Sequence, residues 1–365
     1  MKCGVIGLPN VGKSTLFNAI TQAGAETANY PFCTIEPNAG MAAVPDRRVD
    51  ALASMFHPKK TTYALVEFVD IAGLVKGASR GEGLGNKFLS HIREVDALVH
   101  VVRCFDDPNV LHVDGNVDPV RDAGIVALEL ILADLETVSK RLERARKTAR
   151  PGDAKAAREI GLAERAIAHL ELEKPMRSLS MTDDERAIAK GWFTLTDKPV
   201  LYAANIAESL VGEPEDDLPY IGGMRALASA EGAELMVISA RVESEIAAMD
   251  AGEKAMFLEE LGIGESGLDR FAKASYKLLG LISFLTAGAD ECRAWTISRG
   301  TKAPRAAGKI HTDFERGFIR AEVVPFDTLA REGSMGACRD KGLIRSEGKD
   351  YEMKDGDVTL FRFNV

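Results

Sequence analysis

The chain has 365 residues, of which 46% are hydrophobic and 28% charged, and its formal net charge is −9. This length exceeds one ordinary hydrophobic core and predicts two or three domains. The composition excludes a disordered chain, and the acidic balance disfavours a generally basic nucleic-acid binder while leaving room for a local basic patch.

Export and membrane signals are not visible in the sequence. No stretch approaches ~20 uninterrupted apolar residues, and the first residues, MKCGVIG, run straight into a strand pattern. The five cysteines are odd in number and lack C-x-x-C spacing, so reduced thiols are expected rather than disulfides or a zinc site; they are Cys3, Cys33, Cys104, Cys292 and Cys338. We therefore expect a cytoplasmic protein.

The first chemical signal is GLPNVGKST at residues 7–15, which matches G-x-x-x-x-G-K-S. A short apolar strand precedes it and the helix pattern LFNAI follows, as a phosphate-binding P-loop requires. In such a loop backbone N–H groups close around phosphate oxygens, Lys13 reaches the β and γ phosphates as a catalytic group, and Ser14 ligates Mg²⁺. The predicted nucleotide contacts here are Asn10, Val11, Gly12, Lys13, Ser14 and Thr15.

The stretch ALVEFVDIAG supplies a further metal ligand. Asp70 follows an apolar run, at the carboxyl end of a predicted strand, where ligands of open α/β sheets gather. Asp70 and Gly73 form D-x-x-G, so the aspartate can hold the magnesium shell and the glycine N–H can meet a γ-phosphate. Thr34, in the loop NYPFCTIEPN, could cap the metal. The sequence therefore predicts an Mg²⁺ site formed by Ser14, Thr34 and Asp70.

Three motifs together resemble a known family: the loop YPFCTIEPN, the run DIAGLVKGASRGEGLGNKFL, and N-x-x-E at residues 205–208. They closely resemble the Obg-like ATPases of the YchF subfamily, and the similarity extends from Met1 to the closing DGDVTLFRFNV. The resemblance implies an α/β P-loop NTPase domain with an inserted α-helical hairpin and a C-terminal β-grasp (TGS) domain.

The sequence lacks the glutamine that positions the attacking water in Ras-like enzymes. Leu74 stands where Ras-like enzymes carry a glutamine, and leucine can neither donate nor accept a hydrogen bond. The resemblance points to His112, in FDDPNVLHVDG, as the group that acts on water; an ordinary surface histidine is the alternative. Asn10 could help to bind K⁺ near the phosphates, or it could simply be a helix-entry asparagine.

Residues 128–195 are expected to form an inserted helical hairpin. Apolar positions step by three and four from Leu128, PGD at 151–153 breaks the pattern, and the pattern resumes from Ile160. Residues 140–158 carry eight Lys or Arg against two acidic residues, a net of +6. Such a charge run is usually a solvated face, but a projecting basic tip is also what contact with ribosomal RNA requires.

The stretch LYAANIAESL alters the base-reading motif N-K-x-D of GTPases. Ile206 replaces the lysine and Glu208 the aspartate, so guanine preference should be lost, while Asn205 can bond the adenine edge or neighbouring loops. The partner loop MVISA places the small residues Ser239 and Ala240 near the base edge, and Phe105 either packs near the nucleoside or belongs to the core. With the resemblance, ATP is the expected substrate.

From Leu281 the pattern changes to short strands: RAWTI, GFIRAEVV and a hairpin over YEMKDGDVTLFRF with Asp355-Gly356 as its turn. The stretch AAGKIHTDFERGFIRAEVV resembles a TGS domain. Its basic residues suit RNA or protein contact; they are Lys309, His311, Arg316 and Arg320. The predicted domains are a nucleotide domain in two segments, 1–127 and 196–280, the hairpin at 128–195, and the TGS-like domain at 281–365.

The sequence thus predicts a monomeric Mg²⁺-dependent ATPase, with K⁺ as a further candidate cofactor and without a membrane partner. Ribosome association is expected, through ribosomal RNA or a ribosomal protein, in a translation or stress-response switch. Two alternatives remain open at this point: an Obg-type GTPase, and an adenine-nucleotide-sensing adaptor whose hydrolysis is incidental.

Overall fold

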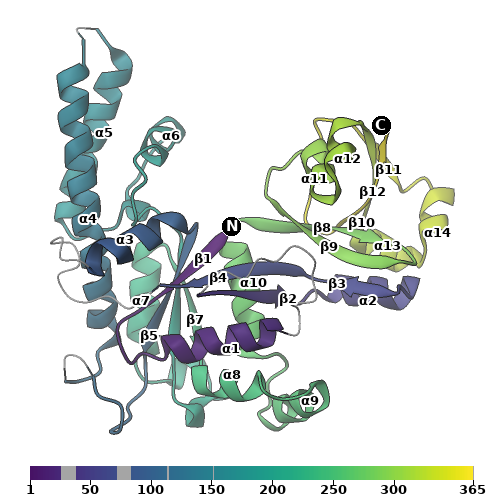
Figure 1. The fold of residues 1–365 in the computed structure, drawn as a ribbon, viewed down its shortest axis with the longest axis horizontal. Coiled ribbons are helices and arrows are strands. Elements are labelled where there is room, and N and C mark those ends of the chain that lie inside the picture. The colour runs from purple at the N-terminus through teal and green to yellow at the C-terminus, as the bar shows by residue number, and fades with distance from the viewer. Residues whose placement is uncertain (26–37, 72–83, 113–114, 151, 365) are drawn as a thin grey trace. The chain divides into compact units, whose positions relative to one another are not determined.

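A computed structural model describes residues 1–25, 38–71, 84–112, 115–150 and 152–364 (Figure 1). Contacts between Cα atoms divide the chain into two compact units. The first unit comprises Met1–Met41 and Glu67–Phe271, and the second comprises Ala42–Val66 and Ala272–Val365. Each unit is therefore built from two separate segments of the chain.

The first unit is built on a six-stranded sheet with the order β2-β4-β1-β5-β6-β7. Its strands are β1 Lys2–Ile6, β2 Ala39–Val44, β4 Ala64–Asp70, β5 Ala97–Arg103, β6 Val200–Asn205 and β7 Glu234–Ile238. The neighbours β4-β1-β5-β6-β7 pair in parallel, and every residue of β5 and β6 is buried. Burial on both faces explains their continuous apolar runs, and the parallel direction brings their carboxyl ends to one edge.

Helices accompany this sheet. They are α1 Lys13–Ala25, α3 Leu84–Glu94, α7 Ile221–Glu231, α8 Ala240–Ile246, α9 Ala251–Glu260 and α10 Gly267–Leu278, with short 3₁₀ turns at Glu208–Leu210 and Glu215–Asp217. The α1 helix follows β1 directly through the P-loop, so the predicted order of strand, loop and helix is confirmed. No helix in the described ranges is both long and apolar enough to cross a membrane.

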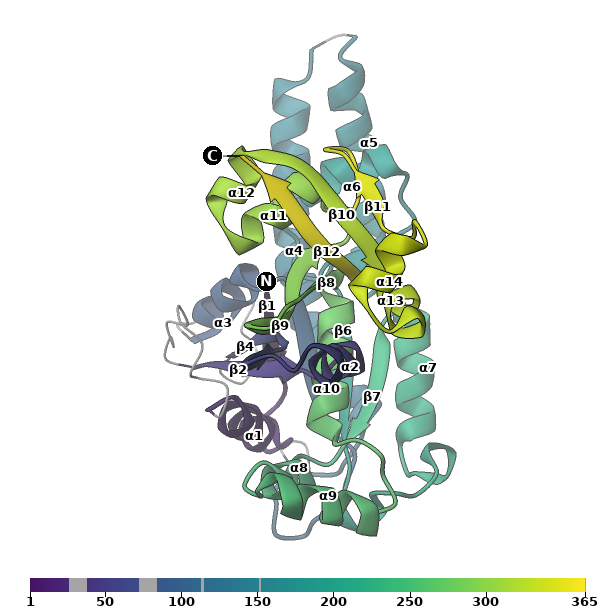
Figure 2. The same ribbon diagram turned by 90° about the vertical axis from the view of Figure 1, so that its right-hand side faces the viewer.

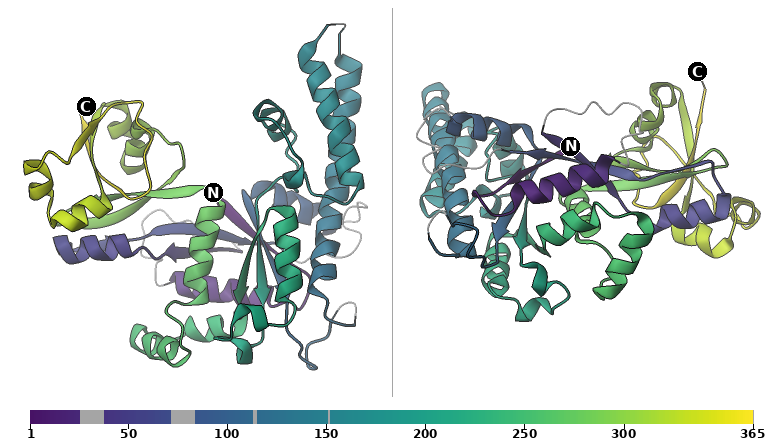
Figure 3. Two further views of the ribbon diagram at one scale, coloured as in Figure 1. Left: turned by 180° about the vertical axis from the view of Figure 1, so that it is seen from behind. Right: turned by 60° about the horizontal axis from the view of Figure 1, so that its bottom comes forward.

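The predicted helical hairpin consists of α4 Pro119–Thr148 and α5 Ala154–Glu171, which lie side by side (Figure 3). Asp118 caps α4 and Asp153 caps α5, so the expected break at 151–153 is confirmed. However, α4 begins nine residues before the predicted Leu128, whose side chain is 38% exposed.

The hairpin has a hydrophobic cluster of its own. Leu142 and Leu162 contribute from α4 and α5, and Trp192 covers the cluster after α6 Asp183–Lys190. The buried carboxylate of Asp134 accepts hydrogen bonds from the backbone N–H groups of Leu195 and Thr196, at 2.7 and 2.8 Å. This contact ties α4 to the segment that leads into β6.

The second unit contains another six-stranded sheet, with the order β11-β10-β12-β8-β9-β3 (Figure 2). Its elements are α2 Arg47–Phe56, β3 Lys60–Thr62, β8 Leu281–Ala287, β9 Glu291–Ser298, α11 Ala303–Ile310, α12 Thr312–Arg316, β10 Phe318–Pro325, α13 Phe326–Glu332, α14 Met335–Asp340, β11 Arg345–Glu347 and β12 Asp357–Phe363. The β8-β9 and β10-β12 pairs are antiparallel, whereas β12 and β8 are parallel at the centre. With α11 packed on the core, this is a β-grasp arrangement, as predicted.

The predicted hairpin over YEMKDGDVTLFRF is wrong. Only residues 357–363 form a strand, and β12 pairs with β10 and β8 rather than with the residues before the turn. Asp355 and Gly356 bond Ser283 instead: Asp355 Oδ1 accepts from Ser283 N, and Gly356 N donates to Ser283 O, both at 2.8 Å. Central pairing buries residues 357–359 and Phe361 of β12, whereas Leu360, Arg362 and Phe363 remain exposed.

The predicted first segment, 1–127, also differs from the observed units at one place. Helix α2 and strand β3 belong to the second unit, where β3 pairs with β9 and Arg48 bonds both oxygens of Asp355 at 2.9 and 3.3 Å. These contacts join residues about 230 to 307 positions apart. Local sequence patterns carry no signal for such pairing.

Candidate nucleotide site

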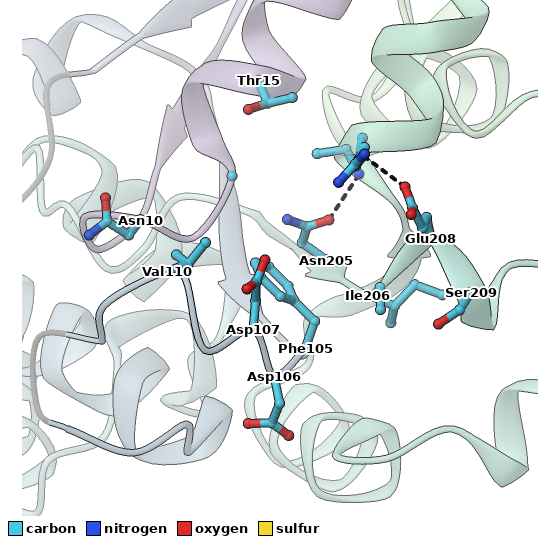
Figure 4. Close-up of a pocket in the computed structure, with 14 residues that line it drawn as sticks. Asn10, Thr15, Phe105, Asp106, Asp107, Val110, Asn205, Ile206, Glu208 and Ser209 are labelled. Carbon is cyan, nitrogen blue, oxygen red and sulfur yellow. Dashed lines mark hydrogen bonds and ion pairs between the residues drawn. The ribbon is translucent and has the colours of Figure 1, made fainter.

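A pocket of about 510 Å³ lies in the first unit, where loops follow the carboxyl ends of β1, β5, β6 and β7 (Figure 4). Its lining includes Asn10, Gly12 and Thr15 of the P-loop, Phe105 to Asp107 and Val110 after β5, Asn205 to Ser209 after β6, and Ala240 and Arg241 at the start of α8. Eight of the predicted nucleotide contacts thus line one cavity: Asn10, Gly12, Thr15, Phe105, Asn205, Ile206, Glu208 and Ala240.

The P-loop backbone adopts conformations that point to its role. Asn10 has φ 63° and Gly12 has φ 90°, both in the left-handed region. A Cβ atom on Gly12 would collide with Nδ2 of Asn205, so only glycine fits there. Helix α1 begins at Lys13 and carries no acidic residue in its first turn. Its N-terminal N–H groups can therefore meet an anion without a competing carboxylate.

Lys13 and Asp70 meet at this edge of the sheet. Lys13 Nζ is paired with Asp70 Oδ1, and Asp70 ends β4 beside Val5 of β1. Ser14 is exposed in the first turn of α1, whereas Thr34 and Gly73 lie outside the described residues. A hydroxyl and a carboxylate oxygen are hard donors that suit Mg²⁺, which commonly takes its other ligands from water and phosphate. The described residues contain no group of three or more acidic, histidine or cysteine ligands.

Asn205 holds two loops together. Its Nδ2 donates to the carbonyl of Val11 at 2.8 Å, and its Oδ1 accepts from the N–H of Ala240 at 2.9 Å. The side chain is buried. Of the two sequence-based options for Asn205, bonding the base or bonding neighbouring loops, the structure therefore shows the second. Buried hydrogen bonds of this kind fix the P-loop relative to the start of α8.

The predicted base-reading motif has an ion-pair partner, Arg241, that the sequence analysis missed. Glu208 Oε2 lies 2.7 Å from Nε of Arg241, and Figure 4 shows this ion pair at the pocket. Ile206 is buried, lines the pocket, and donates its N–H to the carbonyl of Ile238 at 2.9 Å. Arg241 directly follows the predicted Ser239-Ala240 pair, and this adjacency was the one available signal.

Within the predicted Ser239-Ala240 pair, Ser239 has an unusual environment. Its hydroxyl is buried and has no hydrogen-bond partner among the described residues, and it caps α8 without a side-chain bond. Ala240 is buried beside it. A buried hydroxyl without a partner is costly, so this atom is a candidate for contact with a bound group.

Phe105 lines the pocket, and the side chain of Arg103 contacts the Phe105 ring and the loop that follows β5. The Arg103 guanidinium carbon lies 4.7 Å from the Phe105 ring centroid, and Nε donates to the Phe105 carbonyl at 3.0 Å. Arg103 also donates to the carbonyls of Asp107 and Val110, at 3.3 and 3.0 Å. One buried side chain therefore shapes the pocket wall after β5, another contribution that the sequence analysis missed.

His112 faces α4 rather than the pocket. Its Nε2 lies 2.7 Å from Oδ2 of Asp122, both side chains are nearly buried, and Arg121 pairs with the same carboxylate at 2.9 Å. His112 is not one of the pocket's lining residues. The P-loop nevertheless contacts the residue that precedes His112, because Asn10 Nδ2 donates to the carbonyl of Leu111 at 3.2 Å. The role of His112 on water stays a prediction.

The chain was also compared with known proteins. It is 54% identical to the ribosome-binding ATPase YchF of Bacillus subtilis (strain 168) over the full length of both chains. It is 50% identical to the protein of the same name from Escherichia coli O157:H7, over 100% of this chain and 99% of that one. The chain belongs to the YchF family. Its C-terminal residues 281–364 match the family model YchF-GTPase_C, described as a protein of unknown function, and residues 2–135 match a model described as 50S ribosome-binding GTPase.

A solved YchF structure gives the same fold. The YchF GTPase of Schizosaccharomyces pombe superposes with a TM-score of 0.89 at 38% identity, covering 99% of this chain and 97% of that one. The recognition of the YchF family and the predicted fold class are therefore confirmed.

Proposed function

We propose that this YchF-family protein is an Mg²⁺-dependent ATPase that prefers ATP to GTP and turns it over slowly. The Glu208–Arg241 pair is the observation that carries the base preference. Guanine presents two donors, N1–H and the 2-amino group, which a carboxylate accepts in GTPases. Here the carboxylate already accepts from a guanidinium, and Ile206 replaces the bracing lysine with an apolar surface. Adenine, which lacks the 2-amino group, fits this chemistry better.

The P-loop would bind the phosphates of the nucleotide. Lys13 would leave Asp70 to contact the β and γ phosphates, while Ser14 and Asp70 would hold Mg²⁺, with Thr34 as a further proposed ligand. The metal supplies charge neutralisation at the β and γ oxygens. For K⁺ the candidate is the Asn10 side-chain oxygen, because Nδ2 of that amide donates to Leu111.

Hydrolysis breaks the bond between the γ-phosphorus and the β–γ bridging oxygen, and a water oxygen forms the new bond. The proton of that water must pass to a base or to the phosphate. We propose His112 for orienting the water, with Asp122 as the positioning residue that fixes its imidazole. For His112 to reach water at the γ-phosphate, the loop after β5 would have to bring it from α4 into the pocket.

Ribosome association is proposed on two grounds. The relatives from Bacillus subtilis and Escherichia coli are named ribosome-binding ATPases. In this chain the hairpin tip exposes Arg144, Lys147 and Arg150, which can neutralise RNA phosphates. Such a monomer would act in the cytoplasm, where the nucleotide state could set ribosome occupancy.

The proposal has a two-part test. ATP and GTP are titrated in parallel with Mg²⁺ against wild type and against Lys13→Ala, which should bind neither nucleotide productively. ATP should bind wild type more tightly than GTP. Equal affinities would favour an Obg-type GTPase, and tight ATP binding without any turnover would favour a nucleotide-sensing adaptor.

The ribosome arm uses co-sedimentation across a salt series with an ATP analogue and with ADP. Glutamate at Arg144, Lys147 and Arg150 should weaken binding and flatten its salt dependence, because fewer counterions are released. The matched control places glutamate at Lys174, Arg186 and Lys190, which are exposed in the same inserted region outside 140–158. Identical sedimentation of both variants at every salt concentration would remove the hairpin tip from the interface.

A further inference from the structure

Arg103 is a buried cation at the carboxyl end of β5, next to the nucleotide pocket. Its side chain is 2% exposed, and it makes no ion pair with a carboxylate within the part of the chain that the structure describes. Its Nε, Nη1 and Nη2 atoms donate instead to the carbonyls of Phe105, Val110 and Asp107, at 3.0, 3.0 and 3.3 Å. Burying a charge is costly unless polar groups replace the lost water. The loop that follows β5 therefore supplies the polar partners of this guanidinium.

The loop that Arg103 holds is also a wall of the nucleotide pocket. The three residues whose carbonyls accept from Arg103 all line the cavity, as does Asp106 between them. Figure 4 shows that Phe105 and Asp107 point up from this loop, whereas Asp106 points down. Because a guanidinium is a rigid planar fork, its bonds fix the positions of the carbonyls relative to one another. The shape of this wall thus depends on one side chain.

The ring of Phe105 lies between Arg103 and the cavity. The guanidinium carbon of Arg103 is 4.7 Å from the ring centroid, within the range of a cation–π contact. The guanidinium covers one face of the ring, and the half-buried ring still lines the pocket. An aromatic ring with a free surface in a nucleotide pocket is a platform on which a base can stack.

The sheet register places Arg103 beside Asn205. The two residues are partners in the parallel pairing of β5 and β6, and the N–H of Cys104 donates to the carbonyl of Asn205 at 2.8 Å. Asn205 fixes the P-loop and the start of α8, whereas Arg103 fixes the loop that carries Phe105. Two neighbouring residues at one edge of the sheet therefore hold different walls of the same pocket.

We propose that Arg103 is a positioning residue for ATP, which holds the Phe105 ring in the orientation in which the purine stacks on it. This inference rests on the proposed ATP binding and deepens it, because it assigns a contact to the face of the purine. The Glu208–Arg241 pair concerns the edge of the purine. Every base has a π face, so Arg103 should contribute equally to the binding of ATP and GTP.

The first test compares three ligands by calorimetric titration of the full-length protein with Mg²⁺: ATP, GTP and inorganic tripolyphosphate, which has no base. Arg103→Met should weaken ATP and GTP binding by about fivefold each, the lower end of what base–aromatic stacking contributes, and leave tripolyphosphate binding unchanged. Arg103→Lys keeps a cation at the ring and should recover part of the loss. Equal weakening of all three ligands would overturn the proposal, because it would indicate a disturbed P-loop or fold.

The matched control is Arg177→Met. Arg177 has a side chain that is 12% exposed, donates to the carbonyl of Thr196 at 3.3 Å and does not line the pocket. Its replacement removes a second well-buried guanidinium and should leave the affinities for all three ligands within twofold of wild type. A loss of ATP affinity equal to that of Arg103→Met would assign the effect to general destabilisation and overturn the positioning role.

A double-mutant cycle tests whether Arg103 acts through Phe105. Phe105→Ala should weaken ATP binding about as much as Arg103→Met, and combining the two substitutions should weaken it no further, since either one alone removes the ordered ring. Losses that multiply in the double variant would show that Arg103 acts by another route and would contradict the proposal.

Phe105→Trp adds a spectroscopic readout, measured against wild type to subtract the emission of Trp192 and Trp295. ATP should quench the new indole emission by stacking, tripolyphosphate should not, and adding Arg103→Met should remove most of the quenching at saturating ATP. Unchanged emission in Phe105→Trp with ATP bound would overturn the inference while leaving ATP as the substrate. Wild-type protein that binds ATP no more tightly than tripolyphosphate would contradict the proposed function itself.

Discussion

Arg241 and Glu208 form an ion pair at the nucleotide pocket, with 2.7 Å between Nε and Oε2. Arg241 is the second residue of α8, which follows β7, and Glu208 begins a 3₁₀ turn after β6. The pair therefore joins the two loops that would surround a base. Both side chains are substantially exposed, 71% and 49%, so its contribution to stability is small, under about 1 kcal/mol. We expect the pair to matter because Arg241 occupies the Glu208 carboxylate, which would otherwise be available to accept hydrogen bonds from a base.

Removing the guanidinium should uncover Glu208. We expect Arg241→Ala to raise GTP affinity relative to ATP by about threefold to fivefold, in line with an exposed ion pair worth under about 1 kcal/mol. The measurement is a parallel titration of both nucleotides with Mg²⁺. Glu245, which also lies near Arg241 at 3.7 Å, provides the control variant Glu245→Ala, which should leave the ratio unchanged.

Restoring the residues of N-K-x-D should shift the preference further. In Ile206→Lys with Glu208→Asp, the lysine stem regains its bracing position and the shorter carboxylate can accept from guanine. Each polar recognition element is worth about 1–3 kcal/mol when its partner would otherwise be unpaired. Adding Arg241→Ala should increase the gain. A double variant that still binds ATP more tightly than GTP, by the wild-type ratio, would contradict this account of base selection.

Asn205 should affect nucleotide affinity without affecting base choice. Asn205→Ala leaves the Val11 carbonyl and the Ala240 N–H without their partner, which costs about 1–3 kcal/mol and loosens the P-loop. ATP and GTP should lose affinity by the same factor. Asn205→Asp, which can accept from Ala240 but not donate to Val11, should fall between wild type and alanine. A change in the ATP to GTP ratio would instead place Asn205 on the base.

His112 and Asp122 should act on turnover. His112→Ala is expected to keep ATP affinity and reduce the hydrolysis rate, because the imidazole would act on water in the transition state rather than on bound ATP. Asp122→Asn keeps the shape of the partner but removes its charge, so it should reduce the rate less and shift the pH profile. Single-turnover hydrolysis from pH 5.5 to 8.5 measures both. Unchanged turnover in His112→Ala would exclude the histidine from the reaction.

Acid should destabilise the first unit through His100. Burial, assisted by the charge of Arg177, lowers the pKa of this β5 histidine from 6.5 to about 3. As the pH falls below 6.5, His100 therefore binds a proton in the unfolded chain but stays neutral in the folded chain. Stability is full above that value and falls by about 2 kcal/mol between pH 7.5 and 5.

The check is urea unfolding of wild type and His100→Phe at both pH values. Phenylalanine keeps a ring against Tyr202, whose centroid lies 5.4 Å from that of His100, and it cannot titrate. The wild type should lose about 2 kcal/mol more than the variant on acidification. Equal losses would show that carboxylates alone govern the acid response.

The sequence by itself determined the elements that depend on neighbours along the chain. GLPNVGKST between an apolar strand and a helix identified the P-loop, and the apolar steps with the 151–153 break identified the α4-α5 hairpin. Strand and helix periodicities, glycine positions and caps act over a few residues, so one sequence can reveal them. The family resemblance rested on motifs of this local kind.

Only the tertiary structure decided which of these elements meet. Asn205 bonds Val11 across 194 positions, and Arg48 of α2 bonds Asp355, in the turn before β12, across 307. The approach of Arg241 to Glu208 and of His112 to Asp122 also depends on how loops and helices pack. The physical reason is that the hydrophobic effect has no direction, so many alternative pairings of apolar segments bury similar areas and are similarly stable. Hydrogen bonds and ion pairs are directional, but they distinguish among these pairings only after the backbones have been brought together.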